Sequence, residues 1–162
     1  MKKEASSEPV IEDGDNYSGP SDGLSMKFIV LEQFRRCTIE GSKAMAGVED
    51  PRGVKNQAET FINSVIVMEA VLVPYFMQKD NKDLLNKNQV VDREISSINR
   101  ACLEETKEYK KRTSKSGYNA RIVNTIQTRH EHHLIKTYYQ KLSILSMLLS
   151  NENFFEVGGA IS

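Results

Sequence analysis

The sequence predicts an all-α fold: a four-helix bundle-like domain with a buried central second helix, an extended N-terminal arm and a short C-terminal tail. An apolar run over residues 61–73 is longer than a typical strand and carries no period-two alternation. Segments on both sides of this run repeat apolar residues at three- and four-residue steps, which is the spacing of one helix face. We therefore divide the chain into an acidic arm (1–23), a helical domain (24–150) and a tail (151–162).

The central helix is predicted within residues 54–78. One stripe of it joins four apolar residues: Phe61, Val65, Met68 and Leu72. Other apolar residues cover most of the remaining circumference, and a helix that is apolar all round must be surrounded by other elements. A membrane span needs about 20 consecutive apolar residues, and polar residues interrupt this run before it reaches that length. Because Pro74 lacks an N–H, we expect the helix to kink or end near Val73.

Composition favours one ordinary domain with tails. The 162 residues are 39% hydrophobic, and 22 basic residues balance 22 acidic ones, so no global field draws the protein to nucleic acid or to a membrane. Cys37 and Cys102 are isolated and indicate small core residues in a reducing compartment. The N-terminus lacks the apolar segment of a secretory signal. We expect the protein in the cytoplasm, or in a particle assembled there.

The first helix is predicted to begin at Leu24, with Ser25 as a candidate N-cap and with Gly41 and Gly47 marking its end. Residues 50–53 then form a turn, or an N-cap followed by proline at the first helical position. The arm before this helix is rich in Pro, Ser, Gly and acidic residues. That composition cannot bury a core.

A strict alternation of four- and three-residue steps predicts the third helix as a coiled-coil-like seam. The seam comprises Leu84, Asn88, Val91, Ile95, Ile98, Cys102, Glu105 and Tyr109. Its two polar members, Asn88 and Glu105, either lie near helix ends where water reaches them, or Asn88 fixes a register.

The last helix is predicted over residues 119–149, a length of about 45 Å. That length exceeds its predicted neighbours, so one end should overhang the bundle or pack on another molecule. The tail contains Phe154 and Phe155 and is too apolar to be solvated, so we expect it to fold back or dock.

All three histidines fall within Arg129–His133, but their spacing fits neither the zincin motif nor the paired Glu-x-x-His of ferritin-like proteins. On a helix His130 faces the core, His133 lies beside that face and His132 points away. Glu69 of the central helix is a candidate partner for His130. We predict no metal site, no cofactor and no catalytic residue, and hence a protein that is not an enzyme.

The strongest local charge lies in residues 107–121, where six basic residues accompany one acidic residue. We predict that the basic side chains bind a partner: Lys107, Lys110, Lys111, Arg112, Lys115 and Arg121. Three interpretations remain open. The charges compensate a helix dipole beside a solvated loop, or they contact phosphates with Tyr109 and Tyr118 available for stacking, or they receive the acidic arm of a neighbouring subunit.

We therefore expect a structural or adaptor subunit of a larger protein assembly, and a virus-particle accessory protein fits these traits. The expected partners are other protein subunits, which it contacts through the arm and the tail. The alternative is a small helical nucleic-acid-binding regulator that uses residues 107–121.

Overall fold

The computed structural model describes residues 20–49, 56–76, 81–113, 117, 119–157 and 160–161. Within these residues the chain forms α1 (Pro20–Glu49), α2 (Asn56–Phe76), α3 (Lys82–Arg112), α4 (Ala120–Asn151), β1 (Glu156–Val157) and β2 (Ala160–Ile161). The two short strands pair antiparallel in the tail. The all-α, four-helix fold class is confirmed, and the small hairpin is a feature that the sequence does not indicate.

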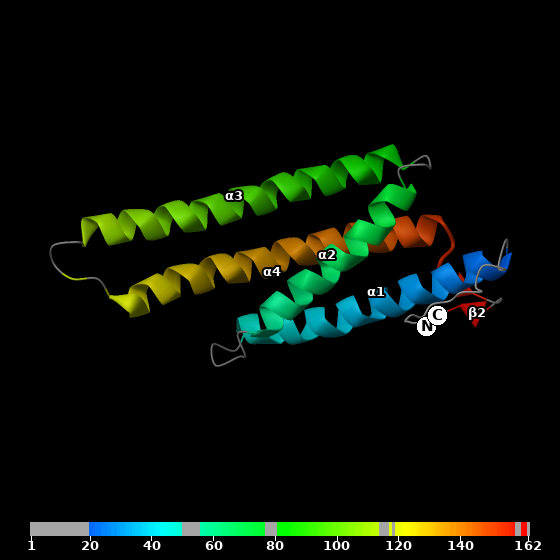
Figure 1. Cartoon of the computed structure of the whole chain (residues 1–162), viewed down its shortest axis with the longest axis horizontal. Coiled ribbons are helices and arrows are strands. Elements are labelled where there is room, and N and C mark those ends of the chain that lie inside the picture. The colour runs from blue at the N-terminus through cyan, green and yellow to red at the C-terminus, as the bar shows by residue number, and fades with distance from the viewer. Residues whose placement is uncertain are drawn as a thin grey trace, which may run out of the picture.

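Helix α4 is the element on which the other helices pack. It lies antiparallel beside α3 on one side and contacts α1 and α2 on the other, while α1 and α2 also pack on each other (Figure 1). In this view α2 runs obliquely across α4 and α1. The arrangement places α4, rather than α2, at the centre of the bundle.

The predicted apolar stripe of α2 is the part of that helix that enters the core. Phe61, Val65, Met68 and Leu72 are all buried, and they join one cluster with residues of α1, α3 and α4. Cys37 of α1 is fully buried in the same cluster, as predicted, and its thiol contacts the Ser64 carbonyl oxygen at 3.2 Å. Burial raises the pKa of this thiol, so it behaves as a small core group rather than a nucleophile.

The opposite face of α2 is not surrounded. Ile66, Val67 and Val71 keep 45%, 53% and 44% of their surface exposed, so the helix is buried along one side only. The helix also continues through Pro74 to Phe76, instead of ending near Val73. Within the described residues no helix combines the length and the apolar content that crossing a membrane requires.

Helix α1 differs from its prediction at both ends. It begins at Pro20, so Ser25 lies inside it and is not the N-cap, and it ends at Glu49 beyond both predicted terminating glycines. Gly41 serves packing instead: a Cβ there would lie 2.9 Å from Phe61 Cε1 and 3.2 Å from the Tyr139 ring. Residues 1–19 and the turn expected at 50–53 lie outside the described residues.

Helices α3 and α4 form a long antiparallel hairpin that projects beyond α1 and α2 (Figure 1). The overhang predicted for the last helix therefore exists. Helix α3 has 31 residues and α4 has 32, so α3 lies beside α4 along this overhang. The projecting part has its own small cluster of Tyr109, Val123 and Ile126. Asn119 caps α4 by accepting a hydrogen bond from the Arg121 backbone N–H at 2.9 Å.

The chain after α4 folds back on the bundle, as predicted. Phe154 is buried, and the ring of Phe155 lies 5.5 Å from that of Phe34 on α1, measured between centroids.

Gly41 and Gly47 of α1 should respond in opposite directions to the same substitution. Gly41→Ala should lower the free energy of unfolding by about 1 kcal/mol or more, because overpacking against two aromatic rings outweighs the gain in helix propensity. Gly47→Ala should raise it by up to about 1 kcal/mol, because the new methyl group meets nothing within 4 Å. Urea denaturation of both variants measures the difference, and an equal gain in both would contradict the packing described for Gly41.

Candidate functional site

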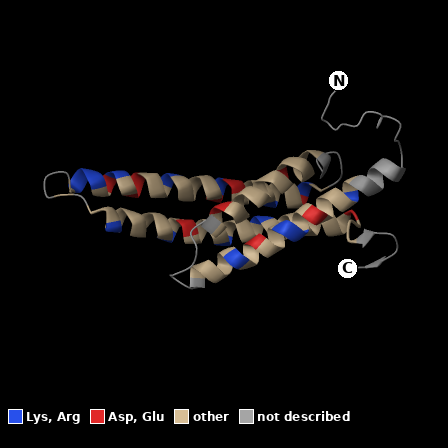
Figure 2. Ribbon diagram, turned by 60° about the horizontal axis from the view of Figure 1, so that its bottom comes forward, with Lys and Arg blue, Asp and Glu red and all other residues tan. Residues whose placement is uncertain are grey.

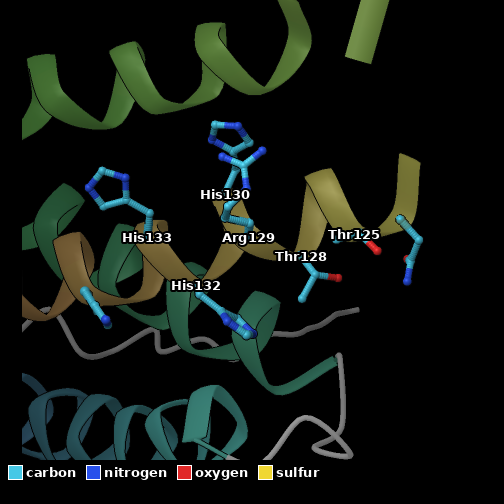
Figure 3. A pocket seen from close by; sticks show the side chains of 8 residues that line it. Thr125, Thr128, Arg129, His130, His132 and His133 are labelled. Carbon is cyan, nitrogen blue, oxygen red and sulfur yellow. The ribbon is translucent and has the colours of Figure 1, made fainter. Parts of the chain in front are cut away.

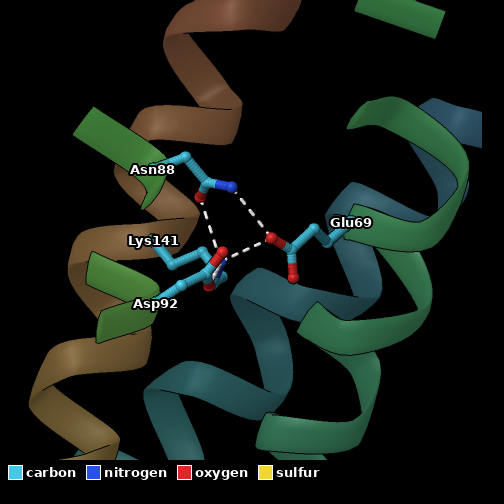
Figure 4. A network of polar contacts seen from close by, with 4 residues as sticks. All are labelled: Glu69, Asn88, Asp92 and Lys141. Atoms are coloured by element: carbon cyan, nitrogen blue, oxygen red, sulfur yellow. Dashed lines mark hydrogen bonds and ion pairs between the residues drawn. The ribbon is translucent and has the colours of Figure 1, made fainter. Parts of the chain in front are cut away.

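The most unusual group in the structure is the ammonium of Lys141 on α4, which is only 1% exposed. Its Nζ donates to Glu69 Oε2 of α2 at 2.6 Å, and to Asp92 Oδ1 and Asn88 Oδ1 of α3 at 2.5 and 3.0 Å (Figure 4). Asn88 in turn donates its side-chain amide to Glu69 Oε2 at 2.8 Å. The three donors of the ammonium therefore meet three acceptors, and the cluster joins α2, α3 and α4.

This cluster has the properties of a structural device rather than of a reactive site. A buried charge needs a paired and hydrogen-bonded partner, and Lys141 has both. The carboxylates of Glu69 and Asp92 remain 23% and 49% exposed, so each acid still reaches water on its outer side. The geometry thus holds the crossing of three helices, and each of the three N–H groups of the ammonium has its own acceptor.

The cluster corrects two expectations from the sequence. Asn88 is buried, so it does not lie at a helix end where water reaches it, while its role in fixing a register stays a prediction. The proposed contact between Glu69 and His130 is wrong, because Glu69 is bound by Lys141 and Asn88.

The burial of Lys141 was not predicted from the sequence. A signal was present, since Lys141 continues the alternating four- and three-residue spacing of the apolar residues on α4: Leu134, Tyr138, Lys141, Leu145 and Leu148.

The three histidines do not form a common site. His132 points away from His130 and His133 around an open hollow of about 790 Å³ on α4 (Figure 3). His130 Nε2 lies 2.9 Å from Glu105 Oε1, and His133 Nε2 lies 3.7 Å from Glu94 Oε2. Among the described residues, no three histidine, cysteine or acidic side chains are grouped so that they could hold a metal ion.

Glu105 is the second polar member of the α3 seam, and water does reach it, since its side chain is 42% exposed. A carboxylate only accepts, so His130 donates from Nε2, and Arg129 donates from Nη2 to the other oxygen at 2.5 Å. The hydrogen bond from His130, and then the one from Arg129, lowers the pKa of Glu105 below its ordinary value of 4.5. The contacts tie α4 to α3 in the projecting part of the hairpin.

The predicted partner-binding residues gather at the tip of this hairpin, which we call the basic tip and define as residues 107–121. The described ones are exposed on the last turns of α3 and the first turn of α4: Lys107, Lys110, Lys111, Arg112 and Arg121. Figure 2 shows basic residues at this end of the hairpin. Lys115 and Tyr118 lie outside the described residues. Tyr109 is buried, and its hydroxyl oxygen accepts a hydrogen bond from the Asn119 backbone N–H at 3.2 Å. It is therefore not available to stack on a base, which corrects that expectation.

Comparison with known proteins adds no family to this description: no family model, no curated protein and no solved structure matches the chain.

Lys141→Met should lower the free energy of unfolding by about 3 kcal/mol, because it leaves Glu69, Asp92 and Asn88 without their shared donor. Lys136→Met, an exposed lysine on the same helix, is the control and should change stability by less than about 0.5 kcal/mol. Thermal and chemical unfolding of both variants compares them. A similar small effect in both would show that the cluster contributes little to stability.

The lowered pKa of Glu105 makes a pH prediction with a defined sign. Stability from this group is fully present above pH 4.5 and is lost as the pH falls through the lower folded-state pKa. A carboxyl NMR titration should therefore place Glu105 below 4.5, His130→Ala should raise its pKa, and Arg129→Ala should raise it less. A larger rise in Arg129→Ala than in His130→Ala would reverse the order of causes given above.

Proposed function

We propose that the protein is a structural or adaptor subunit of a larger protein assembly and performs no catalysis. The observation that supports this proposal most strongly is the uncovered side of α2. Beyond Glu59 and Thr60 near its start, the exposed residues of α2 recur at three- and four-residue steps and none of them is charged: Asn63, Ile66, Val67, Ala70, Val71 and Pro74. We call these residues the α2 stripe. An apolar stripe of this width is the usual face by which a helix packs on another element.

A neighbouring apolar slot extends this surface onto α1. Ile29 of α1 is 65% exposed and lines a cavity of about 100 Å³ together with Val67 and Val71 of α2. Buried residues, including Met68 and Leu72, line the same cavity. Contiguous exposed apolar surface of this kind is a mark of protein contact sites, whereas single exposed aliphatic residues are ordinary.

The basic tip is the second proposed contact surface, and its proposed partner is an acidic protein surface. Two aliphatic residues of the projecting hairpin, Leu103 and Ile122, are also well exposed. Exposed aliphatic side chains beside basic ones suit a protein partner, because phosphates offer nothing for aliphatic groups to contact. A virus-particle accessory protein is one subunit of this kind, located in the cytoplasm or in a particle assembled there.

The second candidate is a nucleic-acid-binding regulator that uses residues 107–121. The open hollow on α4 favours it, because cationic and hydroxyl side chains line that hollow beyond the tip: Thr125, Thr128, Arg129 and Lys136. The buried state of Tyr109 counts against it, since binding of single strands commonly uses stacking on exposed aromatic rings.

The proposal predicts that protein capture depends on the α2 stripe. Tagged protein should capture protein partners from an extract of its source cells in stoichiometric amount, and Val67→Glu should abolish that capture by placing a charge in the contact. The matched control is Val90→Glu on α3, because Val90 is 54% exposed against 53% for Val67. Quantitative mass spectrometry of the captured material gives the comparison, and equal capture by both variants would refute the role of the stripe.

The rival function is tested on the same preparation. Wild type should bind neither duplex nor single-stranded DNA or RNA tightly at two salt concentrations. If the protein does bind with steep salt dependence, and neutralising Lys110, Lys111 and Arg112 flattens the slope by up to about three units, the nucleic-acid function replaces the adaptor function.

A further inference from the structure

We infer that a hollow between α2, α3 and α4 binds an organic cation: an ammonium or guanidinium group carried on an apolar stem. The hollow has a volume of about 370 Å³ and lies beside the first turns of α2. Sites for small ligands commonly lie between the helices of a bundle and measure about 300 to 1,000 Å³. Three helices contribute residues to its wall: Glu59 and Ile62 from α2, Asn99 and Cys102 from α3, and Gln127, His130, Glu131 and Leu134 from α4.

This hollow is separate from both proposed contact surfaces, because it shares no residue with the α2 stripe or the basic tip. Part of its wall is apolar and held in place by the core. Ile62 and Leu134 are partly buried and pack against the main cluster. An aliphatic stem that lies against these two side chains would remove more of their surface from water, which is favourable.

Hydrogen-bond acceptors dominate the polar part of the wall. Glu59 and Glu131 carry carboxylates, which only accept, and the side-chain amides of Asn99 and Gln127 each add a carbonyl oxygen. The ring of His130 is turned toward α3, where its Nε2 donates to Glu105 (Figure 3). The other nitrogen of the neutral ring is therefore an acceptor as well. A ligand that suits this wall is rich in N–H donors.

The two carboxylates have no cation of their own. Among the described residues, the side chains of Glu59 and Glu131 form no ion pair and no hydrogen bond, and none of the residues found to line the hollow is Lys or Arg. Arg129, the nearest basic residue in sequence, is bound to Glu105. An opposite charge nearby stabilises an ionised carboxylate. Charge and apolar surface together thus select a cation on an apolar stem over an anion or a neutral ligand.

Cys102 provides a reporter in the wall of the hollow, since the other cysteine of the chain, Cys37, is fully buried. The full chain is treated with two methanethiosulfonates of similar size, one bearing trimethylammonium and one bearing sulfonate, and each rate is divided by the rate with free cysteine. The cationic reagent should modify Cys102 at least about fivefold faster, because two carboxylates attract it and repel the anion. The chain has no net charge, so its total charge cannot produce this preference.

Matched double variants assign the preference to the hollow. Glu59→Gln with Glu131→Gln should reduce it to less than about twofold. Asp83→Asn with Glu108→Gln removes the same charge from two exposed positions of α3 outside the hollow, and should keep the preference of wild type. Circular dichroism of both variants should match wild type, so loss of folding would not explain a difference.

Protection of Cys102 measures binding of the cation itself. Butylguanidinium and butylammonium should slow the reaction of Cys102 with N-ethylmaleimide at concentrations at least about tenfold lower than butanol, which has the same stem without the charge. A blocked tripeptide with arginine at its centre distinguishes the two sources of such a cation. Protection by the tripeptide at the concentration of butylguanidinium identifies a basic side chain of a protein, and protection by the free cations alone identifies a small amine or guanidine.

Four results would overturn the cation site. They are a Cys102 that does not react in the folded chain, equal rates with the two charged reagents, a preference that persists without the carboxylates of Glu59 and Glu131, and equal protection by butanol and butylguanidinium. None of them changes the expected capture of proteins by the α2 stripe, because the variants alter no residue of that stripe. The adaptor function and the cation site can therefore fail independently.

Discussion

The buried ammonium of Lys141 is the constraint on which the arrangement of the helices depends. An unpaired charge at that depth would cost several kcal/mol, so acceptors from α2 and α3 must converge on α4 at this point. That convergence fixes the rotation of α2 about its axis, because Glu69 has to face inward. Once Glu69 faces inward, the residues on the other side of the same helix have to face solvent. The exposure of the apolar residues on the outer side of α2 thus follows from a polar contact on its inner side.

Periodicity was sufficient to predict the helices and much of the core. The core-facing residues of α2 and most of the α3 seam are buried where the three- and four-residue spacing places them, and those of α2 are Phe61, Val65, Met68 and Leu72. Contacts between segments far apart in sequence were not predictable in this way. From the sequence, Gly41 was interpreted as a helix end. In the structure it gives room to the rings of Phe61 and Tyr139, which come from two other helices. Lys141 was missed because a lysine is usually exposed, although its position continued an apolar spacing.

The same limit applies to the residues that suggested chemistry. The run Arg129–His133 concentrates groups that bind metals or transfer protons, but one helix points successive side chains in different directions. Only His130 and Arg129 meet a common partner, and that partner, Glu105, lies on α3. Residue type alone could not distinguish a cluster in sequence from a cluster in space. For the basic tip, the exposure of the side chains was predicted correctly from the sequence. Charged side chains are usually exposed, so this prediction does not require knowledge of which helices pack together.

The projecting end of the α3–α4 hairpin has a cluster of three buried apolar residues, separate from the main core. Few buried contacts mean a low free energy of local opening, so this end can separate and re-form while the rest of the bundle stays folded. Its backbone amides should then exchange with solvent faster than those beside Lys141. We therefore expect the hairpin to open in two steps, with the projecting end opening before the half within the bundle.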